Sequence, residues 1–214
     1  MNSKKHPLVS FIITTYNLPI EMLRECVESI TDLSLSVSER EIIVIDDGSD
    51  FSPVNELTEM APDIIFVRQP NQGVSVARNL GLKIATGKFI QFVDGDDLLI
   101  NAPYEHCLDI VRYQEPVDIS FTGPLTGQEY MATKNLRASV CCYIFRRDRL
   151  DGLCFTPGIV HGEDEEFTPQ LVLKMHNVYS TDAKAYYYRK RNGSVTHTES
   201  KEAKEKHIAD MLKV

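Results

Sequence analysis

The stretch Lys88-Phe89-Ile90-Gln91-Phe92-Val93-Asp94-Gly95-Asp96-Asp97 joins an apolar run to an acidic turn. Aromatic and β-branched residues dominate 88–93, which predicts a buried strand. Asp94 and Asp96 follow that strand one residue apart, so both carboxylates can point at one hard cation. Mg²⁺ and Mn²⁺ prefer such oxygen ligands and bridge a protein to a diphosphate. The alternative is an ordinary acidic turn in which Asp97 caps the next helix.

The segments before this stretch alternate between strands and helices. Apolar runs rich in β-branched residues predict three strands, and apolar residues at helical spacing predict three helices, one after each strand. The strands are residues 8–15, 41–45 and 64–67, and the helices are residues 19–32, 53–60 and 73–85. Such alternation indicates βαβ units around a parallel sheet, where ligands bind beyond the carboxyl ends of the strands.

The segments after this stretch are less regular, and their patterns are mixed. The predicted elements are helices at 102–113, 161–175 and 202–214, strands at 117–121 and within 177–188, a loop or hairpin at 122–134, and either a strand or the start of a buried helix at 139–145. The length of 214 residues fits one domain, alone or with a small subdomain.

Composition excludes several classes of protein. Hydrophobic residues make up 43% of the chain and charged residues 25%, as in ordinary globular proteins. The 23 basic and 31 acidic side chains give a net charge of −8, which disfavours a nucleic-acid partner because the phosphate backbone selects for Lys and Arg. The apolar runs are far shorter than the ~20 residues that a membrane span needs. The five cysteines have no CxxC spacing, which favours free thiols in a reducing cytosol.

A second acidic turn, Asp46-Asp47-Gly48-Ser49, follows the predicted strand at 41–45. An aspartate at the carboxyl end of a strand can accept a hydrogen bond from the imide N–H of a uracil ring or from ribose hydroxyls. The alternative is a turn in which Ser49 or Asp50 caps the helix that begins near Pro53.

Arg78 and the pair Glu163-Asp164 add a cation and a third acidic site. Arg78 lies in the helix that opens at Gly73, near the sheet edge where a diphosphate would need positive charge. The alternative is a surface arginine. One of Glu163 and Asp164 can serve as a general base if burial and a neighbouring acid raise its pKa. The alternative is the ordinary preference for acids at a helix N-terminus.

Several motifs are absent from the sequence. It contains no GxxxxGK[ST], no GxGxxG after the first strand, no GxSxG and no HExxH, which argues against P-loop, dinucleotide-binding, serine hydrolase and zinc protease chemistry. A sugar-phosphate nucleotidyltransferase would need a glycine-rich basic loop after the first strand, and residues 14–19 do not supply one.

Five motifs, in this order, resemble the family 2 glycosyltransferases of the GT-A fold. They are residues 14–17, 46–49, 71–81, 92–97 and 162–167. Each alone is weak, but all five together are specific, and the resemblance covers roughly residues 7–195. It implies an α/β, Rossmann-like open mixed sheet with helices on both faces and a small acceptor-side subregion. The single domain then divides into a nucleotide-sugar-binding half, 1–121, and an acceptor-side half that carries the catalytic base, 122–214.

The resemblance implies roles for residues that bind the nucleotide. Carried over by position, Thr15 and Tyr16 flank the nucleoside, and Asp46 or Asp47 recognises the base. Arg78 approaches the ribose or the diphosphate.

The resemblance also implies a metal site and a catalytic base. Asp94 and Asp96 form a DXD element that contacts the ribose and a divalent metal, Mn²⁺ or Mg²⁺, with Asp96 as the metal ligand. Asp164 matches the catalytic base. Three later residues are placed to reach the diphosphate: Arg189, Arg191 and His197.

The activity implied is inverting transfer of a sugar, with a UDP-sugar favoured as donor, to the hydroxyl of a saccharide or lipid-linked saccharide acceptor in surface polysaccharide assembly. It implies a cytoplasmic bacterial enzyme; peripheral association with the inner face of the membrane and the oligomeric state are left open. A non-catalytic relative that binds nucleotide sugars is the alternative. The chain departs from the family in its short acceptor half and its lack of Trp, which often lines sugar sites.

Overall fold

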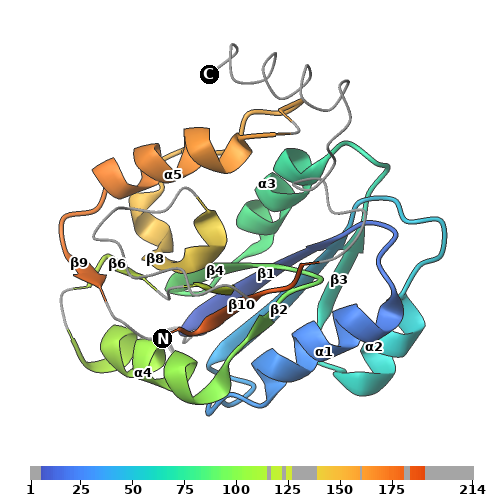
Figure 1. Cartoon of the computed structure of the whole chain (residues 1–214), viewed down its shortest axis with the longest axis horizontal. Coiled ribbons are helices and arrows are strands. Elements are labelled where there is room, and N and C mark those ends of the chain that lie inside the picture. Colours follow the sequence, from blue (N-terminus) through green and yellow to red (C-terminus); the bar gives the residue numbers. More distant parts are fainter. Residues whose placement is uncertain are drawn as a thin grey trace, which may run out of the picture.

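A mixed sheet of seven strands runs through the protein in the order β3-β2-β1-β4-β8-β6-β9 (Figure 1). The structure, a computed structural model, describes residues 6–114, 117–121, 124–126, 139–159, 161–180 and 184–190. Four strands are mutually parallel: β1 (Val9–Thr15), β2 (Arg40–Asp46), β3 (Ile65–Arg68) and β4 (Phe89–Asp94). Beyond them, β8 (Tyr143–Arg146) is antiparallel to β4 and to β6 (Ile119–Phe121), and β9 (Val178–Ser180) is parallel to β6.

Helices cover both faces of this sheet. They are α1 (Ile20–Thr31), α2 (Val54–Met60), α3 (Val74–Ile84), α4 (Asn101–Tyr113) and α5 (Glu163–Leu173). In Figure 1, α3 and α5 lie on one side of the sheet, and α1, α2 and α4 lie on the other. Neighbouring residues of β1 confirm the two layers: the ring of Phe11 lies against Tyr104 of α4, whereas Ile12 meets Gly81 of α3.

The contact between Ile12 and Gly81 requires glycine. A Cβ at position 81 would lie 2.3 Å from Ile12 Cγ2, so any side chain there would push α3 away from the sheet. The central strands are almost wholly buried, as expected for parallel strands covered on both faces. Each fully buried aliphatic side chain contributes about 1.5–3 kcal/mol to folding, so this packing fixes the rigid edge on which the acidic turns stand.

A second sheet of three short strands lies beside the acidic turn at 94–97. It is ordered β5-β10-β7, with β5 (Leu98–Leu99), β10 (Tyr186–Tyr188) and β7 (Pro124–Thr126). β10 is antiparallel to β5 and parallel to β7. The residues that follow the acidic turn are therefore paired with the last strand that the structure describes.

Most of the predicted elements are confirmed. The helix predicted at 73–85 runs from Val74 to Ile84, and the acid-rich helix begins at Glu163. Residues 139–145 combine both predicted forms, with the 3₁₀ turn η1 (Val140–Cys142) leading into β8, and a second such turn, η2 (Arg147–Arg149), follows. Within 122–134 only β7 is described, and the predicted helix at 202–214 lies outside the described residues.

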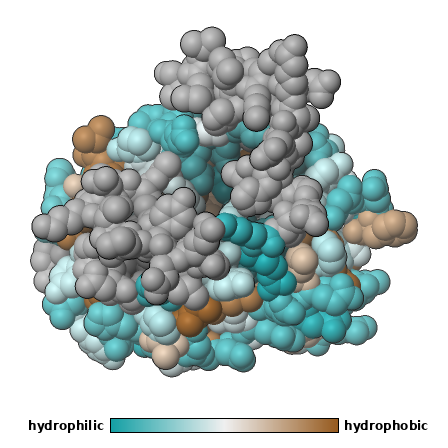
Figure 2. All heavy atoms as spheres, in the orientation of Figure 1, coloured by the Kyte–Doolittle hydropathy of each residue, from teal (hydrophilic) through white to brown (hydrophobic). Residues whose placement is uncertain are grey.

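All five cysteines are free thiols, as predicted, and only Cys154 is exposed. Among the described residues, no helix is long and apolar enough to cross a membrane. Hydrophilic residues predominate on the described part of the face shown in Figure 2, where apolar residues lie in small groups. The exposed large hydrophobic residues include Phe51, Tyr113 and Leu173.

Candidate functional site

The two acidic turns lie at neighbouring strand ends. In the register of the sheet, Thr15 of β1 stands opposite Asp46 of β2, and Thr14 stands opposite Asp94 of β4. The carboxyl ends of β2, β1 and β4 thus meet at one edge, as the sequence predicted. Residues that are far apart in the chain share this edge because the strands are parallel.

The turn at 94–97 has a tightly held backbone. Asp97 N–H donates to Asp94 O at 2.9 Å, and Gly95 N–H donates to Thr14 O at 3.1 Å. A Cβ on Gly95 would lie 3.0 Å from the same Thr14 oxygen, so the close approach of the two backbones favours glycine. The side chain of Asp94 keeps 35% of its surface exposed, and Asp96 is half-buried. Both predicted carboxylates therefore stand on a fixed turn with access to solvent.

This turn fits the binding of a hard cation through few protein ligands. Within the described ranges, no three His, Cys, Asp or Glu side chains form a metal-binding group. Mg²⁺ and similar ions bind through one or two carboxylates, with waters and substrate phosphates completing the shell. Asp94 and Asp96 match that donor set, so the turn can hold a metal that arrives with a diphosphate.

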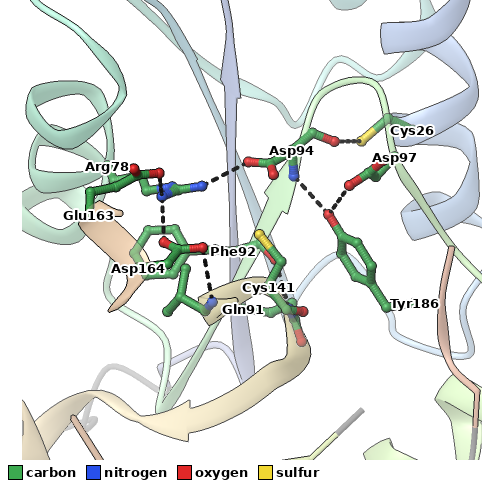
Figure 3. Close-up of polar contacts among 11 residues, drawn as sticks. Cys26, Arg78, Gln91, Phe92, Asp94, Asp97, Cys141, Glu163, Asp164 and Tyr186 are labelled. Carbon is green, nitrogen blue, oxygen red and sulfur yellow. Dashed lines mark hydrogen bonds and ion pairs between the residues drawn. The ribbon is translucent and has the colours of Figure 1, made fainter. Parts of the chain in front are cut away.

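Arg78 is the hub of the site. Its guanidinium is buried and donates from Nη2 to Asp94 Oδ1 at 3.0 Å, and from Nη1 to Asp164 Oδ1 at 2.7 Å and to Glu163 Oε1 at 3.0 Å (Figure 3). Arg78 thus joins the acidic turn to the candidate base Asp164, which lies 86 residues after Arg78 in the sequence. The alternative of a surface arginine is wrong.

The surroundings of Arg78 stabilise its charged form. The rings of Phe92 and Phe155 flank its guanidinium at 5.9 and 5.3 Å from the ring centroids, a distance at which the ring faces attract a cation. Burial works against the charged form, but the carboxylates of Asp164 and Asp94 outweigh it and hold the pKa of Arg78 above its ordinary value. The guanidinium is therefore a permanent cation inside the site.

Asp164 lies in the first turn of α5. The preceding Gly162 has φ of 81°, a left-handed conformation that favours glycine, and the helix begins directly after it. Asp164 Oδ2 accepts a hydrogen bond from Val140 N–H at 3.2 Å. Burial raises the pKa of Asp164 to about 7, against the opposing effect of Arg78 and with further help from the negative charge of Glu163. A carboxyl group with that pKa can exchange a proton near neutral pH.

Helix α3 also holds the segment that leads into α5. Asn79 Nδ2–H donates to Phe155 O, and Phe155 N–H donates to Asn79 Oδ1, each at 2.8 Å. Ser75 Oγ–H donates to Ile159 O at 3.2 Å. The ring of Phe155 stacks on Phe167 of α5, with centroids 3.9 Å apart. These contacts fix the position of the helix that carries the candidate base.

The carboxylate of Asp47 is held by hydrogen bonds within the protein. Its Oδ1 accepts hydrogen bonds from Gln69 Nε2–H at 2.7 Å and Gln72 N–H at 2.9 Å, and its Oδ2 accepts one from Gly73 N–H at 2.8 Å. Asp47 is buried by these partners and ties the loop before α3 to the end of β2. Base recognition by Asp47 stays a prediction.

Asp46 is also buried, but its carboxylate can accept a further hydrogen bond. Its Oδ1 accepts the Ser49 N–H at 2.9 Å, whereas its Oδ2 has no hydrogen-bond partner among the described residues and faces Arg68 Nε at 3.4 Å. Arg68 also donates to Ser49 O and lines an open pocket of about 450 Å³. The other residues that line the pocket are Gly48, Gln69, Pro70 and Asn71. Base recognition by Asp46 stays a prediction, and Arg68, which pairs with its carboxylate, lines this pocket.

Thr15 and Tyr16 lie at the start of the loop after β1. Thr15 is buried, and its carbonyl oxygen accepts the Asp47 N–H at 2.9 Å, whereas the side chain of Tyr16 is exposed. The next residue, Asn17, bonds to the second acidic loop through Ser49 and Asp50. The exposed ring of Tyr16 therefore lies on a loop that is fixed to the end of β2, and its place beside a nucleoside stays a prediction.

Tyr186 and Asp97 complete the site, in roles that the sequence did not predict. Tyr186 of β10 donates its hydroxyl proton to Asp97 Oδ2 at 2.7 Å and accepts the Asp94 N–H at 3.1 Å. Asp97 does not cap a helix, because α4 begins at Asn101. Burial, together with the charge of Asp94, raises the pKa of Asp97 to about 8. Asp97 lay inside a recognised motif, but the sequence holds no signal for Tyr186.

Of the three late cationic candidates, only Arg189 lies within the described residues. Its Nη2 pairs with Glu25 Oε2 at 2.5 Å, and its backbone N–H donates to Asp97 Oδ1 at 2.8 Å. The guanidinium of Arg189 is thus directed to α1 in this structure. Contact between Arg189 and a diphosphate stays a prediction, and the other two candidates, Arg191 and His197, lie outside the described part of the chain.

Comparisons with known sequences agree with this arrangement. The family profile described as Glycosyl transferase family 2 matches residues 10–150. The chain is 30% identical to the uncharacterized glycosyltransferase EpsJ of Bacillus subtilis, over 94% of this chain and 67% of EpsJ. It is 29% identical to the minor teichoic acid biosynthesis protein GgaB of the same organism, over 85% of this chain and 23% of GgaB. The chain therefore spans only part of the length of these relatives.

Solved structures share the fold. The crystal structure of Staphylococcus aureus TarS 1–349 in complex with UDP-GlcNAc is similar with a TM-score of 0.77 and 21% identity, covering 95% of this chain and 66% of that chain. The mannosyltransferase PcManGT from Pyrobaculum calidifontis, in complex with GDP-Man and Mn²⁺, gives a TM-score of 0.71 and 16% identity, covering 98% and 65%. The predicted GT-A fold, an open mixed sheet covered by helices, is confirmed.

Proposed function

The chain belongs to glycosyl transferase family 2, and on that basis we propose that it transfers a sugar, with inversion, from a nucleotide diphosphate donor to an acceptor hydroxyl. The observation that carries this proposal is the buried Arg78, which joins the acidic turn at Asp94 to the candidate base Asp164 at one edge of the sheet. A displacement at an anomeric carbon needs these groups together: one site for the leaving diphosphate and one carboxylate for the attacking hydroxyl.

We propose a UDP-sugar as the donor. The half of the domain formed by residues 1–121 would bind it. Tyr16 would lie beside the nucleoside, and Asp46 together with Arg68 would contact the base. TarS has been solved with UDP and with UDP-GlcNAc, which supports this choice, whereas PcManGT was solved with GDP-Man. An imide edge offers an N–H beside a carbonyl oxygen, and the pair of Asp46 and Arg68 offers an acceptor beside donors.

The diphosphate would lie beyond the turn at 94–97, where Asp96, with Asp94, holds Mn²⁺ or Mg²⁺. The Mn²⁺ in PcManGT supports a divalent metal. A metal held by these carboxylates would supply positive charge to the leaving diphosphate. Arg78 lies next to this turn and supplies a cation that stays charged at neutral pH.

Asp164 would accept the proton of the acceptor hydroxyl. The bond between the acceptor oxygen and the anomeric carbon forms as the bond between that carbon and the diphosphate oxygen breaks, and the diphosphate leaves with the electron pair. A pKa of about 7 suits this role, because the carboxylate is available at neutral pH and is basic enough to take a proton in the transition state. Such proton transfer typically contributes 10²–10⁴-fold to a rate.

We place the acceptor with the half formed by residues 122–214, and propose that it is a saccharide or a lipid-linked saccharide. GgaA and GgaB are described as minor teichoic acid biosynthesis proteins, and another relative is the chondroitin synthase of Escherichia coli. These names support a role in the assembly of bacterial surface polysaccharides. An acceptor of that kind would place a cytoplasmic enzyme at the inner face of the membrane.

Calorimetric titration of UDP with and without Mn²⁺ tests the proposal. We expect UDP to bind more tightly with Mn²⁺, and the complex to raise the melting temperature. A ligand at 100 times its dissociation constant adds about 2.7 kcal/mol to the free energy of unfolding, which a thermal shift detects. If neither UDP nor another nucleoside diphosphate binds under these conditions, the proposed function is wrong.

A further inference from the structure

The acidic turn is held from outside by a strand that lies far along the chain. Tyr186 of β10 accepts the Asp94 N–H at 3.1 Å and donates its own proton to Asp97 Oδ2 at 2.7 Å (Figure 3). One hydroxyl group therefore touches both ends of the turn that contains Asp96. The sequence separation from Asp94 is 92 residues, so this contact depends on the folded arrangement of the two sheets.

The backbone near Tyr186 supports the same turn at other points. Arg189 N–H donates to Asp97 Oδ1 at 2.8 Å, so both oxygens of Asp97 accept hydrogen bonds from the segment 186–189. On the far side of the turn, Ile100 N–H donates to Ala185 O at 2.8 Å, and β10 pairs with β5. The segment 185–189 thus holds residues 94–100 by side chain and by backbone.

This contact is buried and polar, which makes it sensitive to small changes. Tyr186 and Asp97 are 2% and 1% exposed, so no solvent can replace a lost partner without rearrangement. The ring of Tyr186 is itself packed in the hydrophobic core. Removal of the hydroxyl alone would leave the Asp94 N–H and one Asp97 oxygen without their partner, while the packing of the ring would remain.

We propose that Tyr186, through Asp97, is a positioning residue that fixes the turn of Asp94 and Asp96 in the geometry needed to bind a divalent cation together with a nucleoside diphosphate. This inference rests on the proposed function. Mg²⁺ and similar ions demand near-ideal coordination geometry, and a catalytic or binding group must be held to within about 0.5 Å by its supporting contacts. The hydroxyl of Tyr186 supplies such support without touching the metal or the substrate.

The test compares Tyr186→Phe with Tyr187→Phe, which removes a hydroxyl from the next residue of the same strand. Calorimetry measures two affinities for each variant: Mn²⁺ in the presence of saturating UDP, and UDP without metal. For Tyr186→Phe we expect the affinity for Mn²⁺ to fall about tenfold, as for the loss of one buried hydrogen bond, and the affinity for UDP alone to stay within about twofold. Tyr187→Phe should match the parent in both.

Unchanged Mn²⁺ affinity in Tyr186→Phe, with a parent that binds Mn²⁺ and UDP together, would overturn the inference and leave the proposed function intact. Failure of the parent itself to bind Mn²⁺ with UDP would remove both. An equal fall in both affinities would mean a general loss of structure, and would also overturn the positioning role. If Tyr186→Phe does not fold, Asp97→Asn provides the second variant: its amide can replace only one of the two bonds to 186–189, so Mn²⁺ affinity should again fall more than UDP affinity.

Discussion

Replacement of Arg78 by Met should destabilise the protein strongly and make its stability depend on pH. Met has a similar length and can pack between the rings of Phe92 and Phe155, because a thioether makes favourable contacts with aromatic rings. The variant therefore removes the cation with little change in volume. It leaves three carboxylates, those of Asp94, Glu163 and Asp164, without the partner that they share.

The magnitude follows from the burial of these groups. Loss of one partner from a buried ion pair costs about 3–5 kcal/mol. The three carboxylate side chains keep 14–35% of their surface exposed, so solvent screens part of this cost, and we expect about 2–4 kcal/mol. At roughly 2–4 °C for each kcal/mol in a protein of this size, the melting temperature should fall by about 4–16 °C.

The sign of the pH dependence follows from the raised pKa of Asp164. Without the opposing charge of Arg78, the pKa of Asp164 in the folded state rises further above the unfolded value of about 4. A carboxyl group whose folded pKa is raised stabilises the protein below its unfolded pKa, and this stability is lost as the pH rises through the folded pKa. The parent already has a pKa of about 7 at Asp164. The difference between variant and parent should therefore be larger at pH 8 than at pH 5.5.

Urea unfolding at pH 5.5 and pH 8 measures this difference, with Arg24→Met as the control. Arg24 is exposed on α1, so its loss should change stability by less than about 0.5 kcal/mol at either pH. A destabilisation by Arg78→Met below about 1 kcal/mol, or one of equal size at both pH values, would refute the role of Arg78 as the shared counter-charge.

Three further predictions concern the ligands and the reaction. Asp96→Asn should abolish the Mn²⁺-dependent thermal stabilisation by UDP, and an unchanged shift would remove Asp96 from the metal site. Calorimetry should show tighter binding of UDP than of GDP, and the reverse order would rule out the proposed pairing of the base with Asp46. Turnover of the donor should rise with pH and reach half its maximum near pH 7, because Asp164 must be ionised to accept a proton; a rate that is constant from pH 5.5 to 8.5 would contradict this.

The elements of the first half of the sheet could be predicted closely because their signals are local. The apolar run at 8–15 and the acidic residues after 41–45 and 88–93 mark both the strands and the edge at which they end. β5 could not be found in this way, because two residues are too few to show a period. β7 has three residues, and among the described strands it pairs with one that lies some 60 positions later.

The sequence indicated candidate residues for the site but not the contacts between them. The motifs identified Arg78, Asp94 and Asp164, but their ion pairs arise from contacts between α3, β4 and α5 that no local pattern encodes. The motifs also identified Asp47, but not the hydrogen bonds by which its carboxylate holds the loop that precedes α3. Tyr186 was missed because its contacts with Asp94 and Asp97 exist only in the folded protein.

Release of UDP from a radiolabelled UDP-sugar, with water as the acceptor, tests the central claim most directly. It should be measured with and without Mn²⁺ for the parent, for Asp164→Asn, and for Asp151→Asn, a control at a side chain that is 91% exposed. We predict Mn²⁺-dependent release by the parent and by Asp151→Asn, and release at least about a hundredfold slower by Asp164→Asn with unchanged affinity for UDP. Equal rates in the parent and in Asp164→Asn would contradict the claim that Asp164 is the base. UDP binding without release by the parent would favour a non-catalytic nucleotide-sugar-binding protein.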